Sequence, residues 1–113
     1  MDNAKDDSYY LSKIFGDVNK ILEYMQNVSE EDFRNNDELI DAVCFRIIQI
    51  HENFNKVSDK FKVKNPEINY SDIRGFRNRI VHEYGHVDYH IVYETATDDI
   101  YVLHHQLEKI LNK

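Results

Sequence analysis

The stretch that decides the fold is residues 40–61, which read IDAVCFRIIQIHENFNKVSDKF. Its apolar side chains recur every three or four positions and therefore line one face of a helix. They are Ile40, Val43, Cys44, Ile47, Ile50, Phe54, Val57 and Phe61. A stripe this long is typical of a protein core or a dimer interface. We predict one long helix that opens at Asn35, where Asn35 and Glu38 form a capping pattern, and continues to Phe61.

The same helical spacing extends to both sides of this stretch and predicts three more long helices. The first covers residues 7–26, with Leu11, Ile14, Val18, Ile21, Leu22 and Met25 on one face and Asn27 as its stop. The helix after Pro66 begins with Ser71 as cap and ends at Gly85, and its apolar face is Ile73, Phe76, Ile80 and Tyr84. Asp88 caps the last helix, whose inner face is Val92, Ala96, Ile100, Leu103, Leu107 and Ile110. Ser29 and Asp32 resemble a capping box and predict one short helical turn.

Composition agrees with a helical protein. The chain has 113 residues, which suits a single domain over residues 1–113, and only three Gly and one Pro, which are few for a β-rich protein. No segment shows a sustained alternation of apolar and polar residues. We therefore predict an all-α fold, an antiparallel up-and-down bundle of four long helices plus a short helical turn.

Charge and targeting signals narrow the function classes. The net charge is −7, which argues against a large surface for wrapping nucleic acid, although a small patch that touches a few phosphates remains compatible with it. The chain has no apolar run long enough for a membrane span and no signal-peptide pattern, so we expect a cytoplasmic protein without membrane contact. Cys44 is the only cysteine, lies among apolar residues, and is expected to be a buried thiol without a catalytic role.

Residues 74–84, RGFRNRIVHEY, concentrate positive charge in this acidic chain. Arg74, Arg77 and Arg79 lie within six residues, and His82 follows. One interpretation is an arginine-rich helix face in solvent. The other is a site for a phosphate group, because arginine presents a planar, always charged fork to phosphate oxygens.

This segment resembles the signature of HEPN ribonucleases, in which Arg and His are separated by four residues. Arg77 and His82 match that signature, Asn78 matches the Asn that often follows the Arg, and Tyr84 completes the longer form typical of HepT-like toxins. The resemblance implies a dimeric HEPN-like bundle. It also implies an endoribonuclease toxin that needs no metal or other cofactor and in which the 2′-hydroxyl of the RNA attacks the adjacent phosphorus.

Elementary chemistry suits these roles. His82 is expected to transfer protons, because an imidazole pKa near 6.5 populates both forms at neutral pH. Arg77 is expected to bind the phosphate and its transition state, with Arg74 and Arg79 as possible further phosphate contacts. Positions 77 and 82 lie roughly 140° apart on an ideal helix, so a two-fold dimer that brings two motifs to one cleft would help. Asn78 either orients a catalytic group by a hydrogen bond or is a plain surface residue.

The resemblance also implies partners. In HepT-like toxins the tyrosine that matches Tyr84 is the target of a small nucleotidyltransferase antitoxin, which attaches AMP to it; the alternative here is a core tyrosine. The expected partners are the RNA substrate, that antitoxin and a second copy of the chain, with a higher oligomer possible. Two other functions stay open: a noncatalytic binding module that partners a nucleotidyltransferase, and a purely structural helical dimer.

Other histidines are weaker candidates. Residues 82–86 read HEYGH, which matches a zinc-protease pattern, but Gly85 lies where the helix should end and Glu108 is a distant third ligand. We therefore expect no metal site there. His51 is expected to be a half-buried packing residue. His90, His104 and His105 are expected on the surface of the last helix, with adventitious metal binding as the alternative.

Overall fold

The computed structural model describes residues 6–82 and 88–112 of the chain. Every regular element within these ranges is a helix: α1 (Asp7–Tyr24), α2 (Glu30–Arg34), α3 (Asp37–Phe54), α4 (Asp59–Lys64), α5 (Tyr70–His82), α6 (Tyr89–Glu94), the π-helical turn η2 (Thr95–Asp99) and α7 (Ile100–Leu111). The longest are α1 and α3 with 18 residues each, α5 with 13 and α7 with 12. The predicted all-α class is confirmed.

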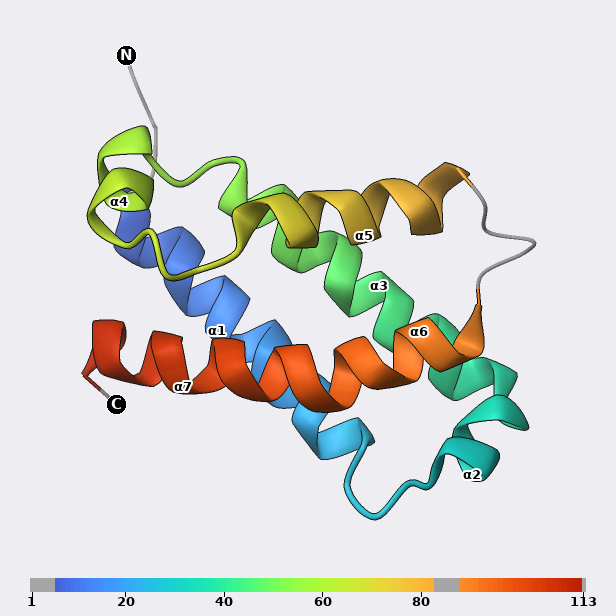
Figure 1. The fold of residues 1–113 in the computed structure, drawn as a ribbon. Helices are drawn as coiled ribbons and strands as arrows, with labels where there is room; N and C mark the ends of the chain where they lie inside the picture. The colour runs from blue at the N-terminus through green and yellow to red at the C-terminus, as the bar shows by residue number, and fades with distance from the viewer. Residues whose placement is uncertain (1–5, 83–87, 113) are drawn as a thin grey trace.

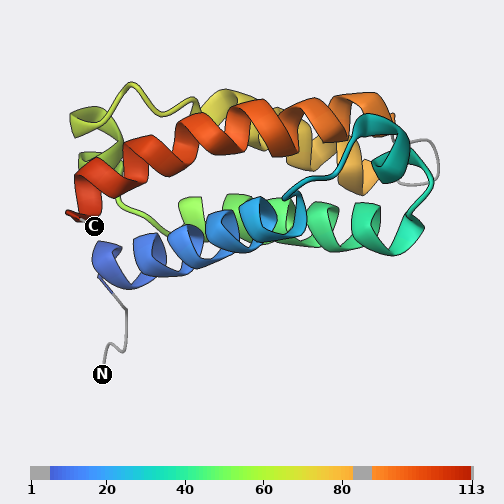
Figure 2. The ribbon, with the colours of Figure 1, turned by 90° about the horizontal axis from the view of Figure 1, so that it is seen from below.

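The helices form two layers. α1 and α3 lie side by side in one layer, and α5 and the continuous rod α6–η2–α7 form the other (Figures 1 and 2). Successive long helices run in opposite directions in Figure 1, as expected for a chain with short connections. The structure contains one copy of the chain, so the dimer stays a prediction.

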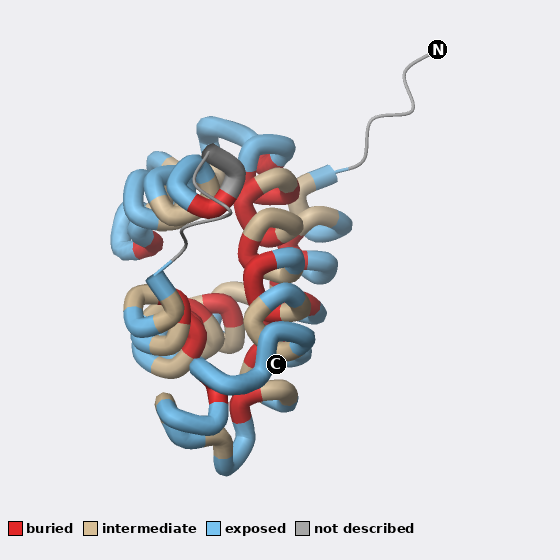
Figure 3. The backbone as a smooth tube through the Cα atoms, turned by 90° about the vertical axis from the view of Figure 1, so that its right-hand side faces the viewer, coloured by how far each residue is buried: buried red, intermediate tan, exposed pale blue. Residues whose placement is uncertain are grey.

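The core lies between the layers, where the apolar stripes meet (Figure 3). The stripe of α1 buries Leu11, Ile14, Val18 and Ile21, and that of α3 buries Val43, Cys44, Ile47, Ile50 and Phe54. The opposite layer buries Ile80, Val92, Ala96, Ile100, Leu103 and Leu107. Ile110, predicted on the same inner face, is only partly buried. Since burial of one such side chain contributes about 1.5–3 kcal/mol, these stripes supply the main stabilisation of the fold.

Several predicted helix ends are confirmed. Ser29 and Asp32 form a reciprocal capping box at the start of α2, and the Asp88 side chain accepts a hydrogen bond from the amide of His90 at the start of α6. Asn27, the predicted stop of the first helix, has a φ of 60°, a left-handed conformation that ends a helix.

The prediction of a single long helix over residues 35–61 is wrong, because α3 ends at Phe54 and a separate helix begins at Asp59. The Ser58 hydroxyl accepts a hydrogen bond from the amide of Phe61 and so caps a separate helix, α4. Asp7 at the start of α1 stabilises this turn between α3 and α4. Its two carboxylate oxygens accept hydrogen bonds from the amide and the hydroxyl of Ser58 at 2.9 and 2.6 Å. Periodicity alone cannot detect such a turn, because Val57 and Phe61 still meet the core after the break.

Two predicted caps are displaced. Asn36 rather than Asn35 caps α3, where its side chain accepts a hydrogen bond from the amide of Leu39. Asn69 rather than Ser71 caps α5, and its side chain accepts from the amide of Asp72 at 3.0 Å. In both cases an Asn one or two positions from the predicted residue caps the helix, because several cap-forming residues lie close together in the sequence.

The last helix contains a π-helical turn that the sequence did not reveal. The turn η2 joins α6 to α7 without a break and directs Ala96 into the core. Such turns are rare and are frequent at functional sites. None of the helices among the described residues is both long and apolar enough to cross a bilayer. Cys44 is buried, as predicted, and burial raises the pKa of its thiol to about 11, so it carries no thiolate near neutral pH.

Candidate active site

Residues 74–82 of the motif segment lie on α5, and the first predicted catalytic residue, Arg77, turns toward α3. There the Arg77 Nη2 atom lies 3.0 Å from Oε1 of Glu52. The Nη1 atom donates a long hydrogen bond of 3.4 Å to Oδ1 of Asn78. The Nε atom is buried and has no hydrogen-bond partner among the described residues. Arg77 is therefore held by one carboxylate and keeps unused hydrogen-bonding capacity.

His51 lies next to the Glu52 carboxylate of this ion pair. Its Nδ1 atom is 3.6 Å from Oε1 of Glu52, and its side chain is only 8% exposed. Both ring nitrogens are buried without a hydrogen-bond partner in the described part of the chain. Burial lowers the pKa of His51, the charge of Arg77 lowers it further, and Glu52 opposes both effects. A neutral imidazole is therefore the favoured form next to Arg77.

The prediction for His51 is corrected by this geometry. The residue is buried rather than half-buried, and it contacts the charged pair rather than serving only to pack. Sequence reasoning missed Glu52 as well. A polar His-Glu-Asn run at residues 51–53, within an otherwise apolar stripe, was the available signal, because such residues are rarely buried without a partner.

The three arginines of α5 lie on two sides of the helix. Arg77 faces Glu52 on α3, Arg74 lines a small pocket together with His51, and Arg79 lines a separate groove on the other side. Asn78 is exposed. One copy of the chain therefore brings Arg74 and Arg77 to the side of α5 that faces α3 and leaves Arg79 on the groove side, so the three predicted phosphate contacts do not meet at one point.

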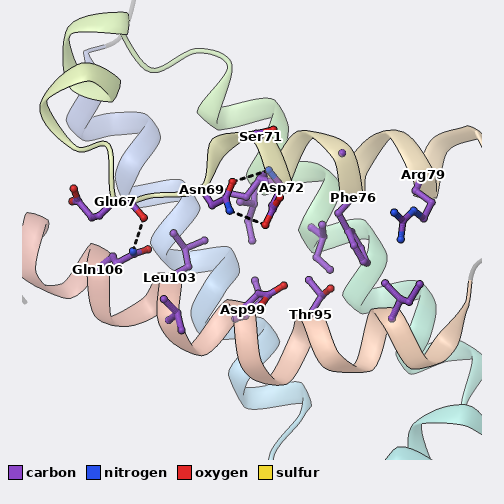
Figure 4. A pocket seen from close by; sticks show the side chains of 17 residues that line it. Glu67, Asn69, Ser71, Asp72, Phe76, Arg79, Thr95, Asp99, Leu103 and Gln106 are labelled. Carbon is purple, nitrogen blue, oxygen red and sulfur yellow. Dashed lines mark hydrogen bonds between the residues drawn. The ribbon is translucent and has the colours of Figure 1, made fainter.

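A groove lies on the Arg79 side of α5. It has a volume of about 560 Å³ and separates α5 from the rod formed by α6, η2 and α7. Figure 4 shows Phe76 and Arg79 extending from α5 toward Thr95 and Asp99 on the opposite wall. At one end the Gln106 side chain donates a hydrogen bond to the carbonyl oxygen of Glu67 at 3.0 Å. The π-helical turn thus contributes two side chains to this groove, Thr95 and Asp99.

The second predicted catalytic residue, His82, is the last described residue of α5, and its side chain lies outside the described part of the structure. On an ideal helix, position 82 is roughly 140° from position 77 and roughly 60° from position 79. Position 82 is therefore closer to the groove side of α5 than to the side where Arg77 meets Glu52. Tyr84, the predicted modification site, lies outside the described residues, as do Glu83, Gly85 and His86 of the zinc-protease pattern.

Residues 6–82 and 88–112 contain one cluster with the composition of a metal site, on α7. Oε1 of Glu108 lies 3.8 Å from Nδ1 of His104 and 3.5 Å from Nδ1 of His105. His104 also stacks on Phe15 with 5.3 Å between ring centroids, which gives it a packing role. The cluster lies on α7 rather than on the motif helix. His104 is half-buried rather than on the surface as predicted, whereas His105 and His90 are exposed, and the Nδ1 atom of His90 lies 2.7 Å from Oε2 of Glu30.

Comparisons with known proteins identify a family and several relatives. The family model described as "Ribonuclease HepT-like" matches residues 14–110. A protein named "Putative RNase" from Caldanaerobacter subterraneus is 30% identical, over 92% of this chain and 93% of its own length. Another "Putative RNase", from Methanocaldococcus jannaschii, is also 30% identical, over 95% of this chain and 88% of its own length. A "Probable ribonuclease HepT" from Thermococcus cleftensis is 28% identical, over 89% and 92%. No solved structure matches the chain at a significant level.

Proposed function

Because the chain belongs to the ribonuclease HepT-like family, we propose that it is an endoribonuclease that cuts RNA with Arg77 and His82 on α5. The observation that carries this proposal is the pattern Arg77-Asn78 followed by His82 on one helix, in a chain that matches the family over residues 14–110. The names of the relatives, which include a "Probable ribonuclease HepT", point to the same activity.

The proposed reaction needs no group beyond the RNA and the protein. The 2′-hydroxyl oxygen attacks the adjacent phosphorus while a base takes its proton, and the bond from phosphorus to the 5′-oxygen breaks as that oxygen gains a proton. The products are a 2′,3′-cyclic phosphate and a 5′-hydroxyl. His82 transfers protons, and Arg77 stabilises the charge on the phosphorane oxygens through its guanidinium. Arg77 must then exchange part of its contact with Glu52 for a phosphate oxygen.

A homodimer completes the proposed site. One histidine cannot readily be base and acid in the same turnover, whereas a two-fold axis would supply two histidines to one cleft. The separation of positions 77 and 82 around α5 supports this arrangement, because residues of two copies can converge where those of one copy do not.

The proposed biological role is that of a toxin controlled by a nucleotidyltransferase antitoxin. Transfer of AMP to the hydroxyl of Tyr84 would place a bulky, negatively charged group two residues from His82. Such a group would block the cleft and repel an RNA phosphate. Co-expression with the antitoxin should therefore add one AMP to wild type and none to Tyr84→Phe, which mass spectrometry of the purified chain measures.

A second candidate is a noncatalytic module that holds a substrate or partner for a nucleotidyltransferase. Two observations favour it: the net charge of −7, which disfavours RNA binding, and the engagement of Arg77 by Glu52 in the single copy. In that case the chain alone would be harmless to cells and would not cut RNA.

The deciding experiment compares His82→Ala with His105→Ala, an exposed histidine on α7 that serves as the matched control. Purified wild type should cut single-stranded RNA in the presence of a metal chelator and leave cyclic phosphate ends, which mass spectrometry identifies. We expect His82→Ala to lose about 10²- to 10⁴-fold in rate, as for removal of a general acid or base, with an unchanged circular dichroism spectrum. His105→Ala should keep the wild-type rate. Equal cutting by wild type and His82→Ala would reject the proposal.

A further inference from the structure

A second, smaller pocket opens beside the ion pair of Arg77 and Glu52, between α3, α4 and α5. Its volume is about 230 Å³. The buried residues His51 and Phe54 form its floor, and the exposed or half-buried residues at its rim are Asn55, Lys62, Tyr70, Ile73 and Arg74. Since a water molecule occupies about 30 Å³ of liquid volume, this space can hold a small polar group together with water.

The rim of this pocket is positive although the protein is acidic. Lys62 from α4 and Arg74 from α5 bring two cations to one mouth, and no acidic side chain lines the pocket. The Tyr70 hydroxyl is engaged elsewhere, because it donates a hydrogen bond to the carbonyl oxygen of Asn65 at 3.0 Å. Charge and hydrogen-bond donors at the mouth therefore favour an anion.

The floor of the pocket carries the observation that points to a ligand. His51 is more than nine-tenths buried, and neither of its ring nitrogens has a hydrogen-bond partner among the described residues. A buried polar group left without a partner costs about 1–3 kcal/mol, so native proteins seldom keep one without a function or a bound group. An oxygen in the pocket would accept a hydrogen bond from the imidazole and remove this cost.

We propose that this pocket is a phosphate subsite, which holds the phosphate of RNA next to the linkage that is cut. The proposal rests on the ribonuclease function proposed above and deepens it. Lys62 and Arg74 bind the phosphate oxygens from the rim, and His51 donates a hydrogen bond from the floor. Glu52 separates this phosphate from Arg77, which serves the scissile linkage. An RNA strand thus passes over α5 with two successive phosphates on the α3 side of the helix.

Phosphate binding should be coupled to protonation of His51. The charged groups that face His51 are Glu52 on its own helix and Arg74 and Arg77 on α5, with Lys62 of α4 and the neutral Tyr70 across the pocket. Without a ligand, burial and the two arginines keep the pKa of His51 low. A phosphate adds negative charge and favours the imidazolium, so its binding should tighten as the pH falls through the His51 pKa.

The first test uses two lysines of the same helix. Lys62 lines the pocket, whereas Lys60, two residues earlier on α4, is exposed outside it. The probe is a short single-stranded RNA with 2′-O-methyl groups, which cannot be cut, and binding is followed by fluorescence anisotropy at several salt concentrations. We expect Lys62→Ala to weaken binding about tenfold and to lower the slope of log K against log salt by about 1. Lys60→Ala should stay within twofold of wild type. Equal losses in both variants would overturn the proposal.

The second test observes His51 directly and identifies the source of the phosphate. The ring signals of His51 in a ¹³C–¹H spectrum are recorded during titration with inorganic phosphate, adenosine monophosphate or the 2′-O-methyl RNA. All three should shift His51 saturably, with the RNA effective at the lowest concentration. Saturation by the mononucleotide at a lower concentration than the RNA would identify a free nucleotide as the ligand and reject an RNA subsite. Unmoved His51 signals would reject the site itself.

These readouts separate the two proposals, since neither requires cutting. If Lys62→Ala binds RNA more weakly but wild type never cuts RNA, the pocket stands and the nuclease proposal fails. If wild type cuts RNA and Lys62→Ala cuts with the same KM as Lys60→Ala, the nuclease stands and the pocket fails. For an active enzyme, Lys62→Ala should raise KM several-fold with little change in kcat, because the lysine binds a phosphate away from the reacting atoms.

Discussion

Arg46 and Arg77 form two similar ion pairs with neighbouring helices, yet their surroundings differ. Nη1 of Arg46 on α3 lies 2.8 Å from Oδ1 of Asp17 on α1, and its Nη2 donates a hydrogen bond to the hydroxyl of Tyr24 at 3.4 Å. Arg77 on α5 pairs with Glu52 on α3 at 3.0 Å. The two arginines are almost equally exposed, at 29% and 28%.

The difference lies in the acids and in the atoms left over. Asp17 is only 11% exposed, whereas Glu52 is 42% exposed and can turn toward solvent. The hydrogen bonds that Arg46 donates to Asp17 and to Tyr24 raise the pKa of Arg46. Arg77 keeps a buried Nε that makes no hydrogen bond within residues 6–82 and 88–112, and both ring nitrogens of the neighbouring His51 are buried there without a hydrogen bond. The comparison indicates that the Arg46–Asp17 pair between α1 and α3 is structural. In the Arg77–Glu52 pair between α3 and α5, the arginine can exchange its contact with Glu52 for a contact with a ligand.

The largest expected effect is on catalysis and should separate the two arginines. Arg77→Ala should lower the rate of RNA cleavage about 10²- to 10³-fold, because it removes a charge that stabilises the transition state. Arg46→Ala should change the rate less than threefold wherever the protein remains folded. Single-turnover cleavage assays at saturating enzyme measure both. A comparable loss of rate in the two variants would contradict the assignment of Arg77 to catalysis and of Arg46 to structure.

The second effect is on stability and should run in the opposite order. Asp17→Ala leaves the Arg46 guanidinium partly buried without its acid, which we expect to cost about 1–3 kcal/mol in the free energy of unfolding. Glu52→Ala breaks a more exposed pair and should cost about 1 kcal/mol or less. Urea denaturation followed by circular dichroism gives both values. A larger loss for Glu52→Ala than for Asp17→Ala would show that the pair at α5 is structural.

The smallest effect concerns a third, surface pair between α2 and α6. The hydrogen bond to Glu30 raises the pKa of His90 above 6.5, with smaller contributions from the charges of Glu30 and Glu94. A raised pKa in the folded state stabilises the protein fully below about pH 6.5, and this contribution is lost as the pH rises through the folded pKa. The Tm of wild type minus that of His90→Asn should therefore be larger at pH 5.5 than at pH 8.5. His51 is present in both proteins, so its contribution to the pH dependence of Tm cancels in this difference. That contribution has the opposite sign, because the pKa of His51 is lowered. A difference independent of pH would contradict the pairing.

The sequence predicted most of the helices because each apolar stripe was continuous. Leu11, Ile14, Val18 and Ile21 were expected on the inner face of one helix and are all buried in α1. The break between α3 and α4 was missed, because it depends on Asp7, 51 positions from Ser58 in the chain. The π-helical turn was missed for a similar reason, since helical spacing hardly changes across it while Thr95 and Asp99 come to face α5.

For the site, the sequence identified the helix and its charge but not its surroundings. The segment around Arg77 stands out through its charges and its family pattern, which are local properties of the chain. Glu52 and His51 gave only the weaker signal of a polar run within an apolar stripe, because their importance comes from their position near Arg77 across a helix interface.

The order of residues alone determined that this chain is helical, which faces of its helices are apolar, and which helix bears the arginines, because periodicity and charge are written along the chain. Tertiary structure decided which acid meets which arginine and which polar atoms are buried without partners. Those outcomes depend on how helices distant in sequence approach each other, and the packing of side chains between layers sets that approach.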